Sequence, residues 1–506
     1  MNKIIYISLF LFTLSSIAFS QSIDDYFSPE KMKEDLEIFK NIRLAANSGL
    51  YKYRTKQQID SIYQWAEEEI ENSNTYLDFF NIINQLTDFE GSAHNTTTLP
   101  KKYKENLKQE KDGYFPYPIK WIDGKWIINY KNDSLPLGSQ IITINNVPIE
   151  EIIVELNRYY TTDGLNTTGK RVGLRTHFSR MYRFRYGQKE KFEVTYKRYE
   201  SESIENRSVE SVGYKQYYKN FNQRYSKPYD QIYYEDLKDD QKYKYEQINS
   251  STGRLTILTF SMGNEKTEEH KTYLAFLDSV FYKIKTENVQ NLIVDVRYNG
   301  GGTDPNDLVT YSFLTQREFQ ENIEAWIGFK KIPYLKYIYT KFPRFVRPIG
   351  VIGYNRSFRR EFPEEKDGKY FQDATSDDHK IRKPSKNAFT GNIYLLVNPE
   401  VASAASLFAA MAAGNDNTTV IGEETMGAYY GHNGHTPLGY ILPQSKIETF
   451  FSVVNLEQDV PKKSNQKYNR GIIPDYDVSQ SVDDYLNQED TQMNFVLDLI
   501  KNKAVN

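Results

Sequence analysis

Short apolar runs and helical periodicity alternate in the second half of the chain. Residues 392–397, NIYLLV, form a run that is too short for a helix and that stops at Asn398-Pro399, so it predicts a buried strand. From Ser403 the apolar positions recur with helical spacing, and Gly414 stands where a C-terminal cap belongs. Ser403 is therefore expected in the first turn of a helix that follows a core strand.

The same alternation precedes this unit. Residues 255–262, LTILTFSM, and residues 291–297, NLIVDVR, predict two more strands, and the spacing between them predicts a helix over 266–285. Strands that alternate with helices indicate an α/β core. The second strand runs into Gly300-Gly301-Gly302, which lets the backbone turn tightly and approach a ligand closely. Neither a phosphate loop nor a dinucleotide fingerprint has this glycine spacing.

The front of the chain is helical. Ser28-Pro29 has the form of a helix start, and helical spacing continues over 56–71 and 76–86. A loop of small residues then carries His94, and packing does not explain a histidine in such a loop.

Strand-like texture follows over residues 114–198. Within it, residues 135–149 (LPLGSQIITINNVPI) resemble the stretch of PDZ domains in which a small-residue turn leads into a strand and a tight Asn turn. PDZ domains bind an extended peptide by adding it as a strand, although a shell that binds nothing stays an alternative. Residues 200–253 are polar and Tyr-rich, and we expect a connector folded over the surface.

An aromatic and basic insertion over residues 315–386 separates the glycine loop from the Ser403 strand. We expect a lid packed over the active-site side of the core. The alternative is a basic aromatic surface that grips a peptide or a membrane interface.

Composition and charge narrow the function classes. The formal net charge of −3 provides no global field that would recruit nucleic acid or an anionic membrane, and with no Cys there are no disulfides, Cys metal ligands or Cys nucleophile. An apolar run at the N-terminus ends in Ala18-Phe19-Ser20, which has the form of a signal peptidase site. We therefore expect an exported protein, periplasmic or secreted, with no stable membrane insertion after removal of a signal peptide. An uncleaved anchor is the alternative.

Ser403 offers nucleophilic chemistry. Unpaired N–H groups and the positive end of the helix dipole gather at a helix start, so a hydroxyl there can attack a carbonyl while neighbouring N–H groups hold the oxyanion. The alternative is that Ser403 only caps the helix.

Four sequence blocks stand in order along the chain: DVRYNGGG at 295–302, SAAS at 403–406, GEETMG at 422–427 and GIIPD at 471–475. Together they resemble the tail-specific, or C-terminal processing, serine peptidases, a superfamily that includes the tricorn core protease and the retinoid-binding modules of the eye. The resemblance implies an α/β fold with a ClpP/crotonase-like core, an N-terminal helical segment and a PDZ-like β domain. It implies Ser403 as the nucleophile and an oxyanion hole made by Gly301, Gly302 and Ala404.

Two departures separate this chain from the Ser/Lys branch of that superfamily. Ala428 stands where that branch carries its lysine base, and Ser406 stands where it carries a glutamate. The tricorn-like branch instead brings a histidine from the loop after the N-terminal helices, and His94 resembles it. His432 and His435 are the alternative bases. The tricorn-like pattern also has a glutamate just before the fourth block. Residues 467–469 stand there in this chain and offer no carboxylate to orient the histidine.

The resulting hypothesis is an exported serine endopeptidase that cuts unstructured or C-terminally exposed polypeptides. A non-catalytic protein that binds a peptide or apolar ligand on the same scaffold and an ester-cleaving acyl hydrolase are the alternatives. We expect no cofactor, and no metal site, because the six His residues are scattered. The predicted divisions are a signal peptide (1–20), a helical segment with His94 (21–105), a PDZ-like domain (106–199), a connector (200–253), the peptidase core (254–480) with its insertion (315–386), and a C-terminal helix (481–506).

Overall fold

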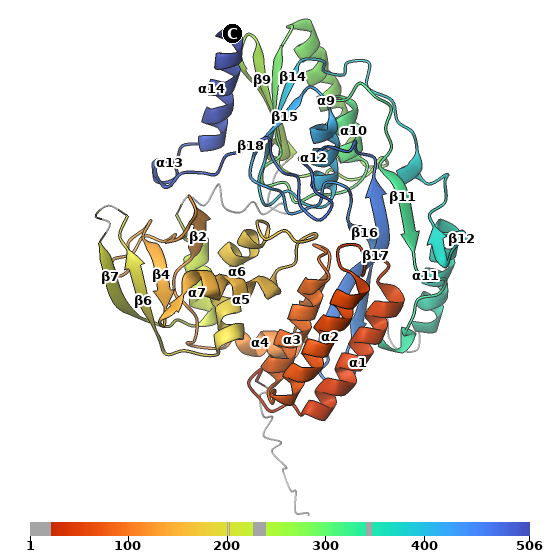
Figure 1. The fold of residues 1–506 in the computed structure, drawn as a ribbon. Coiled ribbons are helices and arrows are strands. Elements are labelled where there is room, and N and C mark those ends of the chain that lie inside the picture. Colours follow the sequence, from red (N-terminus) through yellow and green to blue (C-terminus); the bar gives the residue numbers. More distant parts are fainter. Residues whose placement is uncertain (1–21, 200, 202, 226–238, 341–346, 506) are drawn as a thin grey trace, which may run out of the picture.

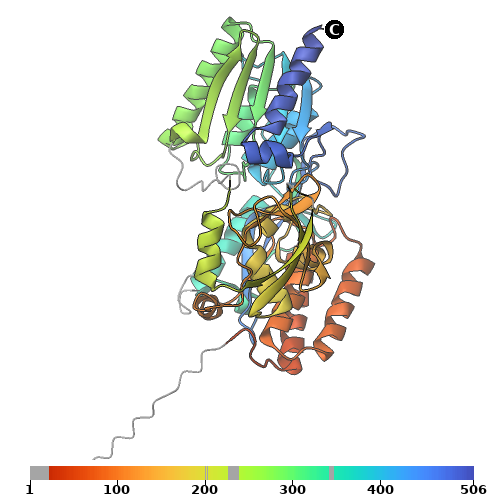
Figure 2. The same ribbon diagram turned by 90° about the vertical axis from the view of Figure 1, so that its left-hand side faces the viewer.

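The computed structural model describes residues 22–199, 201, 203–225, 239–340 and 347–505. Figure 1 shows an α/β core, a PDZ-like domain beside it and an N-terminal helical segment at the opposite end from the core. In the turned view, the PDZ-like domain and the helical segment lie together below the core (Figure 2).

The α/β core is built on a six-stranded sheet with the order β18-β15-β14-β10-β9-β8. All neighbouring strands are parallel except β8, which runs antiparallel to β9 at one edge. Because the parallel strands end at the same edge of the sheet, the loops that follow them meet there. The strands are β8 (Tyr243–Asn249), β9 (Thr252–Ile257), β10 (Asn291–Asp295), β14 (Asn392–Val397), β15 (Thr418–Gly422) and β18 (Tyr476–Asp477).

Helices cover both faces of this sheet. Successive residues of a strand point to opposite faces. On β10, Leu292 and Val294 accordingly pack in one buried cluster with α9, α10 and α12, whereas Ile293 packs in another with α14. The helices are α9 (Glu268–Thr286), α10 (Asn306–Ser312), α12 (Ala404–Gly414), α13 (Val482–Asn487) and α14 (Thr491–Val505). All residues of α12 are buried, as its nearly continuous apolar sequence requires.

A second sheet joins the core to the front of the chain. Its order is β1-β17-β11-β13-β12, and β16 also pairs with β17. The long strand β17 therefore lies between the N-terminal segment and the insertion (Figure 1). The strands are β1 (Thr96–Thr98), β11 (Asn322–Ile327), β12 (Glu364–Lys366), β13 (Lys369–Phe371), β16 (Asn433–Ile441) and β17 (Glu448–Gln458).

The N-terminal segment consists of α1 (Pro29–Ala46), α2 (Lys56–Glu71), α3 (Tyr76–Phe89) and α4 (Lys101–Leu107). Capping boxes start two of these helices, Thr55 with Gln58 on α2 and Thr75 with Asp78 on α3. Gly91, with φ +69°, turns the chain out of α3 into the loop that carries His94.

The PDZ-like domain is an antiparallel sheet with the order β2-β3-β4-β6-β7, covered by α5 and α6. The predicted Asn turn is present, because Asn145 and Asn146 both have positive φ and join β4 to β5 as a tight hairpin requires. The elements are β2 (Ile119–Ile122), β3 (Lys125–Ile128), β4 (Gln140–Ile144), β5 (Val147–Pro148), α5 (Ile149–Leu156), η1 (Asn157–Tyr159), α6 (Lys170–Tyr186), β6 (Lys191–Lys197), β7 (Ile204–Glu210) and α7 (Tyr214–Asn222).

Residues 200–253 differ from the predicted connector. They contain β7 and α7 of the PDZ-like domain, then α8 (Asp239–Lys242) and β8 of the core. On β7, Val209 is the single buried residue. An edge strand with a single buried side chain has no alternation of apolar and polar residues, so its sequence is polar and irregular.

The insertion also differs from the predicted lid. It supplies β11, β12 and β13 to the second sheet, together with η4 (Leu335–Tyr337), α11 (Arg347–Glu361) and η5 (Asp377–His379). Its buried Phe329, Phe358 and Phe362 share a cluster with Ile42 of α1 and Phe451 of β17. The aromatic residues thus build a core of their own between the second sheet and α1.

Some predictions fall outside the described residues. The signal peptide (1–20) does so, as do residues 226–238 of the connector and 341–346 of the insertion. Within the described ranges, no helix is both long enough and apolar enough to cross a bilayer.

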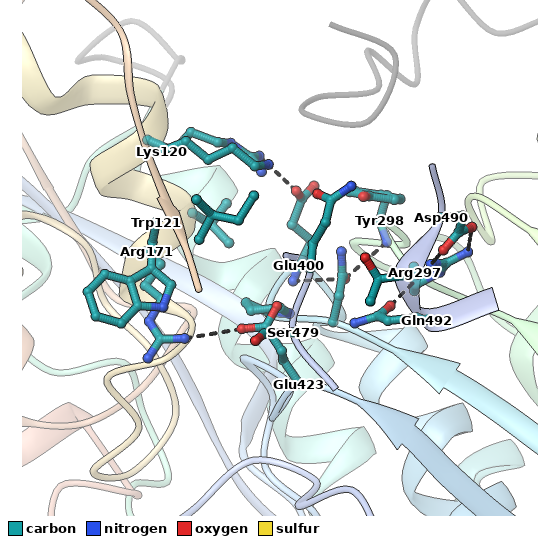
Figure 3. Close-up of a pocket in the computed structure, with 17 residues that line it drawn as sticks. Lys120, Trp121, Arg171, Arg297, Tyr298, Glu400, Glu423, Ser479, Asp490 and Gln492 are labelled. Carbon is teal, nitrogen blue, oxygen red and sulfur yellow. Dashed lines mark hydrogen bonds and ion pairs between the residues drawn. The ribbon is translucent and has the colours of Figure 1, made fainter. Parts of the chain in front are cut away.

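A charged pocket lies between the PDZ-like domain and the core (Figure 3). Arg175 on α6 pairs with Glu400 at 2.7 Å, and Arg171 pairs with Glu423 at 3.1 Å. Glu400 lies three residues before Ser403, and Glu423 directly follows β15. The two ion pairs therefore connect α6 to the segment just before the Ser403 block and to the 422–427 block.

Candidate active site

Ser403 lies between the end of β14 and the start of α12, as the sequence predicts. Its backbone has φ 54° and ψ −133°, a conformation that favours glycine and strains any residue with a Cβ. Such strain persists only where the surroundings hold the residue, and it concentrates at functional sites. The Ser403 hydroxyl is therefore held at the N-terminus of a buried helix, on the sheet edge where the parallel strands end.

Backbone amides surround the hydroxyl. Ala404 is the first residue of α12, so its N–H has no acceptor within the helix. Gly301, with φ +109°, comes so close that an added Cβ would lie 2.9 Å from the Ser403 Cβ and 3.1 Å from the Ala404 nitrogen. The N–H of Gly301 donates to the buried Asn299 Oδ1 at 2.9 Å. The absence of a side chain at Gly301 thus lets its backbone approach Ser403 closely, but its own N–H is already bonded. The amides of Gly302 and Ala404 remain as the predicted donors to an oxyanion.

His94 is brought to Ser403 from the front of the chain. Its Nε2 lies 3.5 Å from the Ser403 Oγ, which is at the long end of a hydrogen bond and typical of a site without substrate. Glu90 closes the loop that carries His94, because its Oε2 accepts a hydrogen bond from the side-chain amide of Asn95 at 2.6 Å. Burial raises the pKa of Glu90 to about 7, against the opposing effect of Arg43.

Asp163 is a site residue that the sequence did not identify. Its carboxylate is 1% exposed and accepts from the backbone N–H of Ala93 at 2.8 Å and of Ala428 at 3.2 Å. In the sequence, Asp163 precedes Gly164 and has the form of an ordinary turn, so only the fold shows its position beside the histidine loop. The carboxylate thereby links the histidine loop to the segment that follows the 422–427 block.

The two groups affect each other's protonation. Burial lowers the pKa of His94, and the negative charge of Asp163 raises it again. Burial raises the pKa of Asp163, and the charge of His94 opposes that increase. A buried carboxylate beside an imidazole stabilises the imidazolium form that general-base catalysis produces.

The alternative bases occupy other positions. The ring of His432 stacks on that of His94 with centroids 5.0 Å apart, and burial lowers its pKa well below the usual range. His435 lies 3.7 Å from a carboxylate oxygen of Glu321. Within the described ranges, His94 is the one histidine of the three with a ring nitrogen in hydrogen-bond range of the Ser403 Oγ.

Small residues fill the places where the Ser/Lys branch carries its glutamate and lysine. The Ser406 hydroxyl donates to the Ser403 carbonyl at 2.8 Å. Gly427 packs so tightly on Ser406 that an added Cβ would lie 2.1 Å from its Oγ. The Ala428 N–H bonds to Asp163. Neither position therefore carries a carboxylate or an amine, and the backbone of residue 428 is bonded to Asp163.

The assembled groups suit acyl transfer. They comprise a hydroxyl, an imidazole beside it, a carboxylate near the imidazole and donor amides at a helix start, which is the set that nucleophilic catalysis on a carbonyl requires. The described residues include no group of three or more His, Asp or Glu side chains that could hold a metal ion.

Comparison with known proteins supports a peptidase core and a PDZ-like domain. Residues 251–478 match the model of peptidase family S41, and residues 111–216 match that of a PDZ domain. The fold is similar to the crystal structure of mature CPAF, at 13% identity and a TM-score of 0.56, over 94% of this chain and 98% of that one. A point mutant of CPAF aligns at 13% identity and a TM-score of 0.59, over 91% and 95%. No curated protein matches the chain.

The family match covers the α/β core and contains Ser403, and the PDZ match covers the domain that α6 ties to that core. The match to peptidase family S41 over residues 251–478 and the match to a PDZ domain over residues 111–216 support a serine-type peptidase with a PDZ-like domain.

Proposed function

We propose that this peptidase is an exported endopeptidase that hydrolyses unstructured or C-terminally exposed polypeptides, with Ser403 as nucleophile and His94 as general base. The observation that carries the proposal is the 3.5 Å separation between the His94 Nε2 and the Ser403 Oγ. This contact also favours hydrolysis over binding alone, because a scaffold that only binds has no need of an imidazole at a strained hydroxyl.

In the first half of the reaction, the His94 Nε2 takes the proton of the Ser403 hydroxyl as Oγ bonds to the substrate carbonyl carbon. In this proposal the backbone amides of Ala404 and Gly302 hold the oxyanion. His94 then gives the proton to the leaving amine, and the C–N bond breaks.

In the second half, His94 takes a proton from water, whose oxygen attacks the acyl carbon. The ester bond to Ser403 breaks, and the proton returns to Oγ. Asp163 stabilises the imidazolium form of His94 in both halves, because its charge favours the protonated ring.

The form of the substrate follows from the PDZ domain. A domain of this kind takes an extended peptide, so a folded substrate would have to expose a free end or an unfolded segment.

The proposal of export rests on the apolar run at the N-terminus. Identifying the N-terminal residue of the protein after expression with its native leader tests it. Gln21 at the new N-terminus is expected, and retention of Met1 in the secreted material would contradict the assignment.

Hydrolysis is tested with a permanently unfolded polypeptide as substrate. We expect fragments with wild type and with the exposed control Ser203→Ala, and none above background with Ser403→Ala. Fragments from the Ser403→Ala protein would remove Ser403 as nucleophile. Binding of the polypeptide by wild type without any cleavage would favour the non-catalytic alternative, and cleavage of esters alone would favour the acyl hydrolase.

A further inference from the structure

We propose that Glu90 is a positioning residue that holds the histidine loop, residues 90–95, in the form that keeps His94 at Ser403. Its carboxylate does so through a hydrogen bond from Asn95. The inference rests on the function proposed above, and it adds the group that keeps the base within reach of the nucleophile.

Glu90 and Asn95 stand at the two ends of the histidine loop. Glu90 directly follows α3, and Asn95 directly precedes β1. The side-chain amide of Asn95 donates to the Glu90 Oε2 at 2.6 Å. Both residues are buried, with 3% and 2% of their surface exposed. One hydrogen bond therefore spans the loop, and it is made by the residue that directly follows the base.

α1 and the second sheet hold the other side of the carboxylate. The Arg43 Nε forms an ion pair with the Glu90 Oε1 at 3.2 Å, and the amide of Asn47 donates to Oε2 at 3.0 Å. Arg43 also donates to the Thr449 hydroxyl of β17 at 2.6 Å. Its guanidinium carbon lies 4.0 Å from the centre of the Phe451 ring. Glu90 is therefore fixed to both α1 and β17.

This network meets the strand pairing that receives the chain after the loop. Thr97 of β1 lies opposite Thr449 of β17. The hydroxyl that Arg43 binds therefore belongs to the residue opposite the strand that leaves the loop. Figure 1 shows the N-terminal helices beside β17, so one short network joins the helices, the sheet and the histidine loop.

A buried ion pair alone contributes little to the stability of a fold. Taking two charges out of water costs about as much free energy as their attraction provides, and apolar residues of similar size often stabilise a protein as well or better. Arg43 is 0% exposed. An apolar pair at these positions could fill the space, but it could not accept a hydrogen bond from Asn95. The hold on the loop therefore explains the buried Glu90 better than stability does.

Of the three donors that contact the carboxylate, Asn95 is the one with the fewest other contacts. The Asn47 Oδ1 accepts from the N–H of Gly49 at 3.1 Å, and Arg43 is bound from β17. The Asn95 Oδ1 is buried and, among the described residues, has no hydrogen-bond partner. Loss of the Glu90 acceptor would therefore release the Asn95 side chain, at the end of the loop next to the imidazole.

Protonation of Glu90 weakens the same contact. The three contacts of its carboxylate are all with donors, so an added proton finds no acceptor among them. Burial raises the pKa of Glu90 to about 7, whereas Arg43 and the two amide hydrogen bonds lower it. One of these is the bond from Asn95, so by linkage the ionised carboxylate binds Asn95 more strongly than the neutral acid does. Tyr63 of α2 also faces Glu90 and stays neutral, because burial raises its pKa well above the usual range.

The pH dependence separates Glu90 from the base. Burial lowers the pKa of His94 from its ordinary value, so His94 gains its proton at lower pH than Glu90 does. As the pH falls, activity should decline first at about pH 7, where Glu90 is protonated. It should decline more steeply at lower pH, where His94 is protonated as well.

The test measures the rate at which a fluorophosphonate labels Ser403 between about pH 5 and about pH 9, which reports on the base without a substrate. Wild type should show both transitions. Glu90→Gln, a neutral isostere, should lose the upper transition and keep the lower one. Above the transitions it should label about 10- to 100-fold more slowly, because the base is less well positioned. The control Glu69→Gln, at an exposed position of α2, should match wild type.

A thermal melt shows whether each variant is folded. Glu90→Gln leaves the buried Arg43 without its carboxylate, so if this variant does not fold, Asn95→Ala takes its place. Asn95→Ala keeps the ion pair and removes only the link to the loop. We expect it to lose the upper transition in the same way.

An upper transition that persists in folded Glu90→Gln or Asn95→Ala would overturn the positioning role, as would a wild-type profile with the lower transition alone. Slower labelling of Glu90→Gln with an unchanged pH profile would also overturn it, in favour of a purely structural role. Each of these results leaves the peptidase mechanism in place. Absence of labelling of the wild-type protein at every pH would remove the proposed function, and the positioning role with it.

Discussion

The His94 Nε2 and the Ser403 Oγ lie 3.5 Å apart although 309 positions separate the two residues in the sequence. The pairing of β1 with β17 explains how they meet. Thr96 lies opposite Phe450, so the strand that begins two residues after His94 is fixed to the second sheet. The side-chain amide of Asn95, next to β1, donates to Glu90 at the end of α3, so this hydrogen bond joins the two ends of the histidine loop.

Replacing Ser403 with glycine should stabilise the protein relative to replacing it with alanine. The backbone at φ 54° strains any residue with a Cβ, and glycine removes that strain. We expect the free energy of unfolding of Ser403→Gly to exceed that of Ser403→Ala by about 1 kcal/mol. Denaturant titration of the two inactive proteins measures the difference, and a lower value for Ser403→Gly would contradict the strain.

Asp163→Asn should change the pH dependence of cleavage as well as its rate. Burial already lowers the pKa of His94, and the charge of Asp163 raises it, so removing that charge lowers the pKa further. The base works when neutral, and activity is lost as the pH falls through its pKa. The acid limb of kcat/KM should therefore move to lower pH in Asp163→Asn.

The same substitution should reduce kcat by about 10- to 100-fold, because the imidazolium form is less stabilised. The exposed Asp133→Asn is the control and should match wild type in both rate and profile. A lower rate with an unmoved acid limb would assign Asp163 a purely structural role.

Gly301→Ala should abolish most activity by crowding the nucleophile. The new Cβ would lie 2.9 Å from the Ser403 Cβ, closer than side chains tolerate. We expect kcat/KM to fall at least about 100-fold, comparable to the loss of an oxyanion donor. Gly124→Ala is the matched control, because Gly124 also has positive φ, +72°, but open space around it. Equal activities of the two variants would mean that strain, and not crowding, decides the effect.

Arg175→Gln should destabilise the contact between the PDZ-like domain and the core. It leaves the Glu400 carboxylate, whose side chain is 12% exposed, without this arginine. Removing one partner of a buried pair costs about 3 kcal/mol, so the free energy of unfolding should fall by roughly that amount. Restoring part of the loss with Arg175→Gln/Glu400→Gln would show that the uncompensated charge causes it. A double variant less stable than the single one would contradict this.

Several elements of the site could be predicted from the sequence. Residues 392–397 and 56–71 coincide with β14 and α2, because an apolar run bounded by Asn-Pro and a periodic segment with a capping box are strong local signals. His94 came from resemblance to the tricorn-like branch. The residues next to His94 in the sequence give no sign of Ser403, because the two meet through the pairing of β1 with β17, strands that lie more than 300 positions apart in the sequence.

The rest depends on tertiary contacts that leave little local trace. Asp163 accepts a hydrogen bond from an amide 70 positions away, and its Asp-Gly sequence is that of a common turn. β7 has Val209 as its single buried residue, so its sequence lacks the alternation of apolar and polar residues that predicts a strand. Aromatic residues of the insertion are buried against α1 and β17, more than 80 positions away in either direction, so composition alone suggested a lid.

The rate at which a fluorophosphonate labels the protein tests the central claim most directly. Peptide mapping of the adduct should locate it on Ser403. The labelling rate constant should fall at least about 100-fold in His94→Ala, because the base that activates the hydroxyl is gone. Equal labelling rates in wild type and His94→Ala, or an adduct on any other residue, would contradict the pairing of these two side chains as nucleophile and base.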